Sequence, residues 1–323
     1  MAASCPLADF YCTLRALGRG DSIPAAPEAL REAAQRLQDL TEYLPDSIPL
    51  RTPENTVLIV HRKNPRYRAH VARLLWRRLD PALTTLCFPE EVPSTLTNIG
   101  IELKPICGTR ADSVQHSLED LYRSAYPLFL TYVWPSHEQR IRTWIRNLGR
   151  ELGPCEGEIL AQVSRDLSLP LVDSSRVRII VVGAGVPDGA TTVRARNGLS
   201  ILLQASQAAD GKEGAFVLLR TYLTGCHSLS PETEKSALRL LEQAIMNTQA
   251  DPKIIRELPQ ELLDYALERT ITRACGWTSP RWKHSDTGAL SGIHANWDAY
   301  LSGGLTLEAA CRAMAAAAVG GQR

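Results

Sequence analysis

The sequence predicts a predominantly helical α+β protein in which helices pack around a small sheet. Over most of the chain, apolar residues recur at the three- and four-residue spacing of a helix that buries one face. The clearest exception is Val177–Val182, whose β-branched residues are typical of a buried strand. Two shorter segments of this kind, Thr191–Val193 and Leu199–Leu203, follow it after a turn that contains glycine. The sequence shows no internal repeat, so we do not expect a repeat architecture.

The composition is that of an ordinary globular protein with a substantial core. The chain has 323 residues, of which 44% are hydrophobic and 22% are charged. Lys and Arg (36) almost balance Asp and Glu (35), which gives a net charge of +1. Such a balance supplies no overall field that would attract nucleic acid or an anionic membrane. We therefore expect neither a nucleic-acid nor a membrane partner.

Targeting signals are not evident in the sequence. No apolar stretch approaches the about 20 residues that a membrane-spanning helix needs. Met1–Phe10 lacks the basic start and apolar run of a secretory signal, so we expect a soluble, cytoplasmic protein. The eight cysteines form no C-x-x-C pair, and we expect them to be reduced and mostly buried rather than bound to zinc.

Residues 1–125 predict a helical N-terminal region with a few strands. Helical spacing indicates one helix at Leu30–Leu40, and Thr56–Val60 is a candidate strand. The basic segment Arg62–Arg78 predicts a helix, which we interpret as a solvated face rather than an anion-binding surface because the whole protein is neutral. Thr84–Phe88 and Ile101–Ile106 are candidate strands.

The remaining helices are predicted from the same apolar spacing, with Ser136 as an N-cap and Pro259 as a point where one of them divides. The predicted helices span residues 112–122, 136–148, 155–167, 214–228, 232–247, 252–273, 293–301 and 306–317.

The turn Gly183–Gly185 is similar to a dinucleotide-binding loop, but two conditions for such a loop fail. The third glycine of that pattern is replaced by Asp188, and Pro187 is followed by the strand-like Thr191–Val193 rather than by a helix. We therefore predict two strands joined by a long turn, and no nucleotide or other cofactor.

Five short motifs occur in a fixed order along the second part of the chain: Trp134-Pro135-Ser136-His137-Glu138 with Trp144-Ile145, Val181-Val182-Gly183, Thr191-Thr192, Trp297–Gly303 and Leu307–Ala310. In this order they resemble the motifs of an uncharacterised bacterial family of zinc-metallopeptidase-like proteins of the H-E-x-x-H class. The resemblance covers about residues 125 to 318 and implies a metallopeptidase-like domain at residues 126–323.

The chain departs from this family at the zinc-binding motif itself. The H-E-x-x-H position reads Leu223-Thr224-Gly225-Cys226-His227, so that only the second histidine is retained. Leu223 cannot bind a metal and Thr224 cannot act as the carboxylate base, whereas a catalytic zinc normally needs three protein ligands. We therefore expect no bound metal and no zinc-dependent peptidase activity.

The leading hypothesis is a metallopeptidase-like pseudoenzyme whose cleft binds a small molecule, a peptide or a protein partner, or has acquired different chemistry. The resemblance places His137 and Glu138 in this cleft, together with Tyr222, Leu223 and Thr224.

Two alternatives remain open. In the first, the protein is an active hydrolase or transferase without zinc. It would use Cys226 and His227, which point about 100° apart on a helix, with Asp264 and Glu268, which lie one helical turn apart. In the second, the protein is a structural subunit whose cleft is packed shut. An open, polar space between helices 214–228 and 252–273 would favour a ligand-binding or catalytic role, and an apolar, filled space would favour a structural one.

Overall fold

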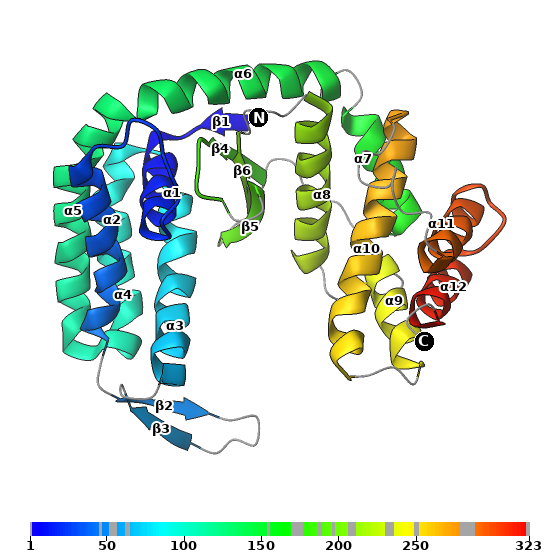
Figure 1. The fold of residues 1–323 in the computed structure, drawn as a ribbon, viewed down its shortest axis with the longest axis horizontal. Coiled ribbons are helices and arrows are strands. Elements are labelled where there is room, and N and C mark those ends of the chain that lie inside the picture. The colour runs from blue at the N-terminus through cyan, green and yellow to red at the C-terminus, as the bar shows by residue number, and fades with distance from the viewer. Residues whose placement is uncertain are drawn as a thin grey trace. The chain divides into compact units, whose positions relative to one another are not determined.

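The protein is predominantly helical and of the α+β class, as the computed structural model in Figure 1 shows. The chain divides into two compact units, and helix α6 (Trp134–Leu152) runs from one into the other. Unit 1 comprises Met1–Arg146 with Val177–Ala209, and unit 2 comprises Asn147–Arg176 with Asp210–Arg323. The structure describes residues 2–44, 47–51, 57–61, 65–153, 156–168, 177–186, 189–195, 198–205, 211–229, 236–248, 252–277 and 288–320.

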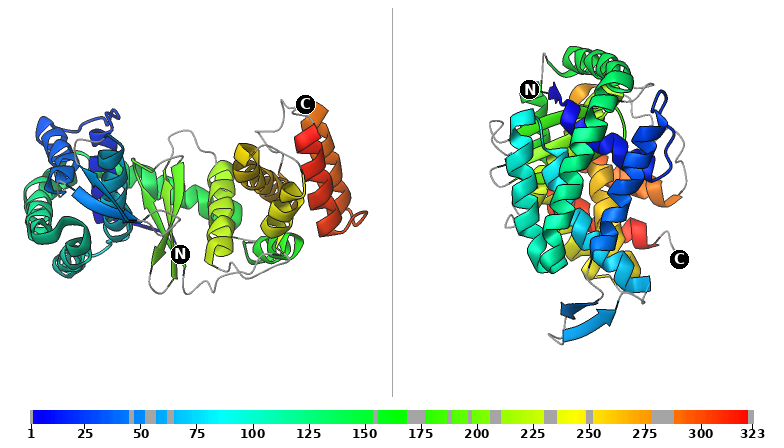
Figure 2. Two further views of the ribbon diagram at one scale, coloured as in Figure 1. Left: turned by 90° about the horizontal axis from the view of Figure 1, so that it is seen from below. Right: turned by 90° about the vertical axis from the view of Figure 1, so that its left-hand side faces the viewer.

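The core of unit 1 is built around helix α1 (Pro6–Gly18), of which ten of the 13 residues are buried. Such burial leaves almost no polar face, so the helical period that identifies an amphipathic helix is hidden in the sequence. This helix contacts α2, α3, α5 and strand β4, and Figures 1 and 2 show the helices of unit 1 gathered on one side of the sheet. The other helices of this unit are α2 (Glu28–Asp39), α3 (Pro65–Thr84), α4 (Val92–Cys107) and α5 (Ala111–Tyr132).

The four-stranded sheet of unit 1 has the order β1-β4-β6-β5. Strands β1 (Ala2–Ser4) and β6 (Gly198–Gln204) both run parallel to the central strand β4 (Val177–Val182). Strand β5 (Ala190–Ala195) pairs antiparallel with β6, so the two segments that follow β4 form a hairpin. The sequence prediction of strand structure in these three segments is thus confirmed. A separate antiparallel pair is formed by β2 (Ser47–Arg51) and β3 (Val57–His61).

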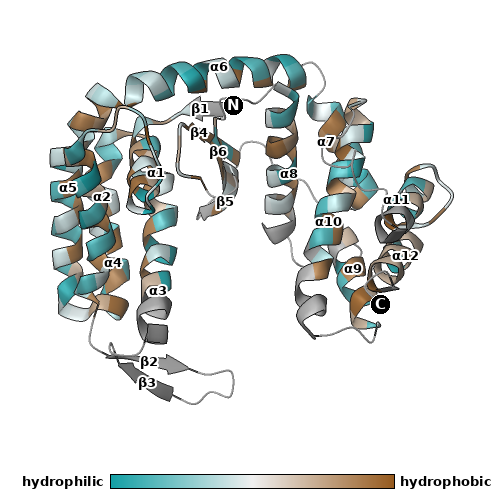
Figure 3. Cartoon of the chain, viewed as in Figure 1, coloured by the Kyte–Doolittle hydropathy of each residue, from teal (hydrophilic) through white to brown (hydrophobic). Residues whose placement is uncertain are grey.

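Unit 2 is helical in its described residues. Helix α10 packs against α7, α8 and α9 and is hydrogen-bonded to α11 through side chains, whereas α12 packs against α9 and α11. In its core, the fully buried Trp297 donates a hydrogen bond from Nε1 to Thr270 Oγ1 at 3.1 Å. Apolar and polar stretches alternate along the helices (Figure 3). The helices are α7 (Glu156–Leu167), α8 (Gly211–Leu229), α9 (Ala237–Met246), α10 (Pro252–Cys275), α11 (Gly288–Leu301) and α12 (Leu307–Gly320).

Four local sequence predictions were wrong, and one of them is Ser136 as an N-cap, because α6 already begins at Trp134. The segment Thr84–Phe88, predicted as a strand, contains the last residue of α3 and no strand. The segment Ile101–Ile106, also predicted as a strand, lies inside α4, because the buried residues of α4 recur at helical spacing. Helix α10 passes through Pro259 without dividing. The domain boundary expected after residue 125 falls within α5. In the described part of the chain, no helix is both long enough and apolar enough to cross a membrane.

The loop after β4 approaches α1 so closely that only glycine fits at residue 185. Gly185 has a φ of 87°, in the left-handed region that side chains other than glycine rarely adopt. A Cβ atom at this position would lie 2.0 Å from the backbone carbonyl oxygen of Cys12. Because that oxygen belongs to a buried helix, it cannot move aside without displacing α1.

We predict that Gly185→Ala lowers the free energy of unfolding by about 2–4 kcal/mol, through backbone strain combined with the clash against α1. Gly189→Ala is the matched control. Its φ is 75° but a Cβ there would meet nothing within 4 Å, so it should cost only about 1–2 kcal/mol. Urea denaturation of both variants measures the difference. Equal losses would show that the close approach contributes nothing.

Candidate functional site

His137, a predicted cleft residue, is buried and engaged with other parts of unit 1. Its Nδ1 lies 2.8 Å from Oδ2 of Asp9, which is fully buried in α1. The other oxygen of Asp9 accepts a hydrogen bond from the backbone N–H of Gly183 at 2.8 Å. A Cβ at Gly183 would lie 2.2 Å from Nδ1 of His137, so glycine is needed for this contact. The arrangement joins α1, α6 and the end of β4.

Glu138, the neighbouring cleft residue, has a different environment. It forms an ion pair with Arg142 one turn further along α6, at 2.7 Å. Exposed pairs of this kind contribute little to stability.

The other predicted site residues belong to unit 2, where α8 packs against α10. Leu223 and Cys226 are fully buried and Tyr222 is buried, whereas Thr224 is partly exposed. His227 lies in the last turns of α8, and its side chain lies outside the described residues.

On α10, the two predicted carboxylates also differ. Asp264 receives two hydrogen bonds from Arg220 of α8, from Nε at 3.4 Å and from Nη2 at 2.5 Å. Glu268 is buried with 3% of its surface exposed. Among the described residues, no group of three or more His, Cys, Asp or Glu side chains is placed to hold a metal ion.

A cavity of about 570 Å³ lies within unit 1, between α1, α3 and the β5–β6 hairpin. It was not among the sites predicted from the sequence. Its charged groups come from α1, from Arg19 directly after α1 and from α3, whereas the strands contribute hydroxyl and apolar side chains. The lining residues are Tyr11, Cys12, Arg15, Arg19, Arg73, Trp76, Arg77, Asp80, Pro81, Thr84, Gly185, Thr191, Thr192, Val193 and Leu202.

The charge of this cavity is strongly positive, because four arginines line it and Asp80 is the only acidic residue among them. Arg15 is held in place by two contacts: its Nε lies 3.3 Å from Asp80 Oδ1, and its guanidinium carbon lies 3.9 Å from the centre of the Trp76 ring. Asp80 also accepts a hydrogen bond from the hydroxyl of Tyr11 at 2.6 Å. The cavity's acidic group is therefore already engaged by Arg15 and Tyr11.

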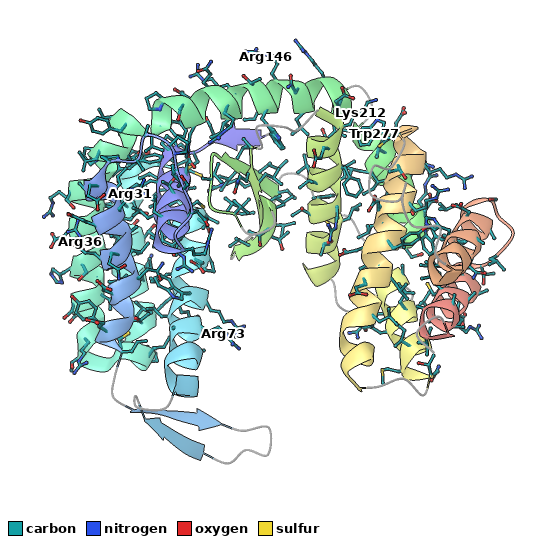
Figure 4. The ribbon with its side chains drawn as sticks, viewed as in Figure 1. Arg31, Arg36, Arg73, Arg146, Lys212 and Trp277 are labelled. Carbon is teal, nitrogen blue, oxygen red and sulfur yellow. The ribbon has the colours of Figure 1, made fainter. Side chains whose placement is uncertain are left out.

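Arg73 and Arg77 are not paired with an acidic side chain in the part of the chain that the structure describes. They lie one turn apart on α3, both are exposed, and neither has a hydrogen bond or ion pair to any residue that the structure describes. Figure 4 shows Arg73 projecting from α3. By contrast, Arg19 contacts Asp21 at 3.2 Å and the carbonyl oxygen of Gly185 at 3.3 Å. Two guanidinium groups at the cavity are thus available to an anion.

Tyr11 and Cys12, on the α1 side of the cavity, are held in their neutral forms. Burial, followed by the charge of Asp80, raises the pKa of Tyr11 well above its usual value. Burial likewise raises the pKa of the Cys12 thiol, and the nearby Asp9 adds to this effect. A neutral, buried thiol is a poor nucleophile. The arrangement is therefore suited to binding an anion rather than to covalent chemistry with Cys12.

The sequence contained one signal for this cavity, the basic segment Arg62–Arg78. The structure confirms helix from Pro65 in this segment. The walls that turn the basic helix into one side of a cavity come from α1 and from the β5–β6 hairpin, far away in the sequence. Comparisons of the chain with models of known families, with curated proteins and with solved structures find no match.

The buried position of Leu223 leads to a prediction. We expect the double substitution Leu223→His with Thr224→Glu, which introduces an H-E-x-x-H pattern that ends at His227, to destabilise the protein by about 2–4 kcal/mol. The reason is that it places polar groups at a site where Leu223 is fully buried. Denaturant unfolding, with and without added zinc, measures the change.

The control for this experiment is Gln243→Glu with Met246→His, two exposed positions of α9 where we expect a change within about 0.5 kcal/mol. If Leu223→His with Thr224→Glu leaves stability unchanged, and zinc then raises it by several kcal/mol, α8 borders an open cleft and its packed interpretation is wrong.

Proposed function

We propose that this protein binds a small organic anion, with two or more negative charges, in the cavity between α1, α3 and the β5–β6 hairpin. The observation that carries the proposal is the pair Arg73 and Arg77, two exposed guanidinium groups at a cavity whose single carboxylate is already engaged by Arg15 and Tyr11. The sequence-based hypothesis also included ligand binding, but in a cleft at Tyr222, Leu223 and Thr224 of α8. The present proposal places the ligand in the cavity of unit 1 instead.

Arginine is well suited to this role because its planar guanidinium group can donate two parallel hydrogen bonds to a phosphate or carboxylate. Arg15 adds a cation whose position is fixed by Asp80 and Trp76. A guanidinium that is already ordered loses less conformational entropy when the ligand binds. Two available cations and one ordered cation match a ligand with several negative charges better than they match a monoanion.

The rest of the cavity supports an organic ligand rather than an inorganic ion alone. Its volume of about 570 Å³ lies within the range of about 300–1,000 Å³ that is common for small-molecule sites. Pro81, Val193 and Leu202 offer apolar surface, whereas Thr191 and Thr192 carry hydroxyl groups that can donate or accept hydrogen bonds. The apolar wall suits the body of the ligand and the arginines its charged groups.

A second candidate is the metallopeptidase-like protein without zinc-dependent activity. It is favoured by the full burial of Leu223, since apolar packing then occupies the position of the first zinc ligand. The buried Leu263 and Leu267 on α10, and the ion pair between Arg220 and Asp264, support the packed, structural form of this hypothesis over a non-zinc enzyme. Metal analysis of the purified protein tests it: one zinc per chain, lost in His227→Ala, would contradict it.

The anion-binding proposal predicts that Arg73→Gln with Arg77→Gln weakens ligand binding at least tenfold, which corresponds to about 1.4 kcal/mol. The loss of two charge-assisted hydrogen bonds accounts for an effect of this size. The experiment is a thermal-shift screen of fructose 1,6-bisphosphate, adenosine monophosphate, adenosine diphosphate and citrate, followed by calorimetric titration of those that stabilise the protein. Binding should also weaken as the salt concentration rises.

The matched control is Arg146→Gln with Arg150→Gln, which removes two exposed arginines one turn apart on α6 that are not among the residues lining the cavity. Figure 4 marks Arg146 on that helix. The control has the same change in net charge, so a specific site predicts less than a twofold effect. Equal weakening in both double variants, or no binding of any of the four compounds, would overturn the proposal.

A further inference from the structure

Two cysteines that are 82 positions apart in the sequence lie together in unit 1. Cys5 immediately precedes α1, and Cys87 follows α3 after a short loop. The thiol of Cys5 donates a hydrogen bond to the carbonyl oxygen of Leu86, the residue directly before Cys87, with Sγ and the oxygen 2.9 Å apart. Neither cysteine is in a disulfide. Because Leu86 and Cys87 are adjacent in the chain, this contact places the two thiols next to one another while both groups are reduced.

The two thiols have unequal access to solvent. Cys5 is buried, with 2% of its surface exposed, whereas Cys87 is partly exposed. A reagent from solution therefore reaches Cys87 first. Cys5, by contrast, is positioned to react only with its neighbour.

A cation lies beside the accessible sulfur. Nη1 of Arg178, on β4, lies 3.9 Å from Sγ of Cys87 and donates a hydrogen bond to the carbonyl oxygen of Thr85 at 3.4 Å. An anion also lies nearby, since Glu91 accepts hydrogen bonds from the backbone N–H groups of Cys87 and Phe88, each at 3.2 Å. The site therefore contains one group that favours the thiolate and one that opposes it.

The balance of these effects lowers the pKa of Cys87 to about 7. The hydrogen bond with Cys5 is the largest cause and Arg178 adds to it, whereas burial and Glu91 act in the opposite direction. The same hydrogen bond, together with burial, raises the pKa of Cys5. At neutral pH Cys87 is then thiolate to a larger extent than an ordinary cysteine, and the thiolate is the form that attacks peroxides and disulfides.

We propose that Cys5 and Cys87 are a peroxide-reactive pair, in which Cys87 is oxidised first and Cys5 then closes a disulfide. In the first step the Cys87 thiolate attacks a hydroperoxide, which yields the sulfenic acid of Cys87 and hydroxide from hydrogen peroxide, or alkoxide from an organic hydroperoxide. In the second, the Cys5 sulfur attacks the sulfenic sulfur, the new S–S bond forms, and water leaves with the thiol proton. The peroxide supplies the two-electron oxidation, so the atoms and electrons balance.

Three other cysteines of the described chain lack this combination. Burial raises the pKa of Cys12, Cys107 and Cys311, and all three are buried. Their thiols remain protonated at neutral pH and are shielded from a reagent in solution. Peroxide should therefore react with the Cys5–Cys87 pair in preference to these three cysteines. Its product would join the start of α1 to the loop that follows α3.

The experiment treats the full-length protein with hydrogen peroxide at pH 7, blocks the remaining thiols by alkylation, and maps peptides without reduction. We expect a linked peptide that contains Cys5 and Cys87, and its loss in Cys87→Ser. In Cys5→Ser, the sulfenic acid of Cys87 should accumulate and react with dimedone. Cys107→Ser is the control and should retain the linked peptide.

A second measurement follows the alkylation rate of Cys87 against pH in the reduced protein. The rate should rise with pH through about 7, because the thiolate is the reactive form, and Arg178→Gln should move the rise to higher pH and slow oxidation at pH 7 several-fold. The proposal is overturned if peroxide converts Cys87 to sulfinic acid without the linked peptide. It is equally overturned if Cys107 is oxidised as fast as Cys87.

Discussion

The carboxyl group of Asp9 is the point on which the arrangement of unit 1 depends. A carboxyl group that is fully buried must have its oxygens satisfied by the protein, because no water replaces a missing partner. One oxygen of Asp9 accepts the N–H of Gly183 and the other lies against Nδ1 of His137, so α1, β4 and α6 meet at a single residue. Loss of either partner would leave a buried polar group unpaired, which typically costs about 1–3 kcal/mol.

With α1 fixed at this junction, one side of the helix packs against α5 and the other side faces the cavity. On one side, Phe10 contacts the rings of Tyr122, Tyr126 and Phe129 of α5, with centroid distances of 5.2, 5.3 and 5.5 Å. Aromatic contacts of this geometry fix the helix against its neighbour. On the other side, the next residue, Tyr11, faces the cavity and hydrogen-bonds to Asp80 of α3. The packing that anchors α1 thereby also positions one wall of the candidate site.

The strand at Val177–Val182 could be predicted because a short apolar, β-branched run has few other interpretations, and most long helices were found from their amphipathic spacing. Helix α1 escaped notice because it is buried on nearly every side and so has no polar face. The strand predicted at Ile101–Ile106 was wrong because its residue types favour a strand, whereas the buried positions Ile99, Leu103 and Cys107 follow the period of a helix. At this segment the local composition therefore predicts a strand, whereas the pattern of buried residues in the fold is that of a helix.

The candidate site was hidden for a related reason. Residues that line the cavity come from segments near positions 11–19, 73–84 and 185–202, and only the fold brings them together. The net charge of +1 argued against anionic partners, but net charge is a sum over the whole chain. Electrostatic attraction acts over about 8 Å at physiological salt, so the charges around a cavity matter more than the total. A neutral chain is therefore a sound argument against a long polyanion such as nucleic acid, which contacts many parts of a surface. It says nothing about a small anion, for which Arg73 and Arg77 beside an already engaged carboxylate are sufficient.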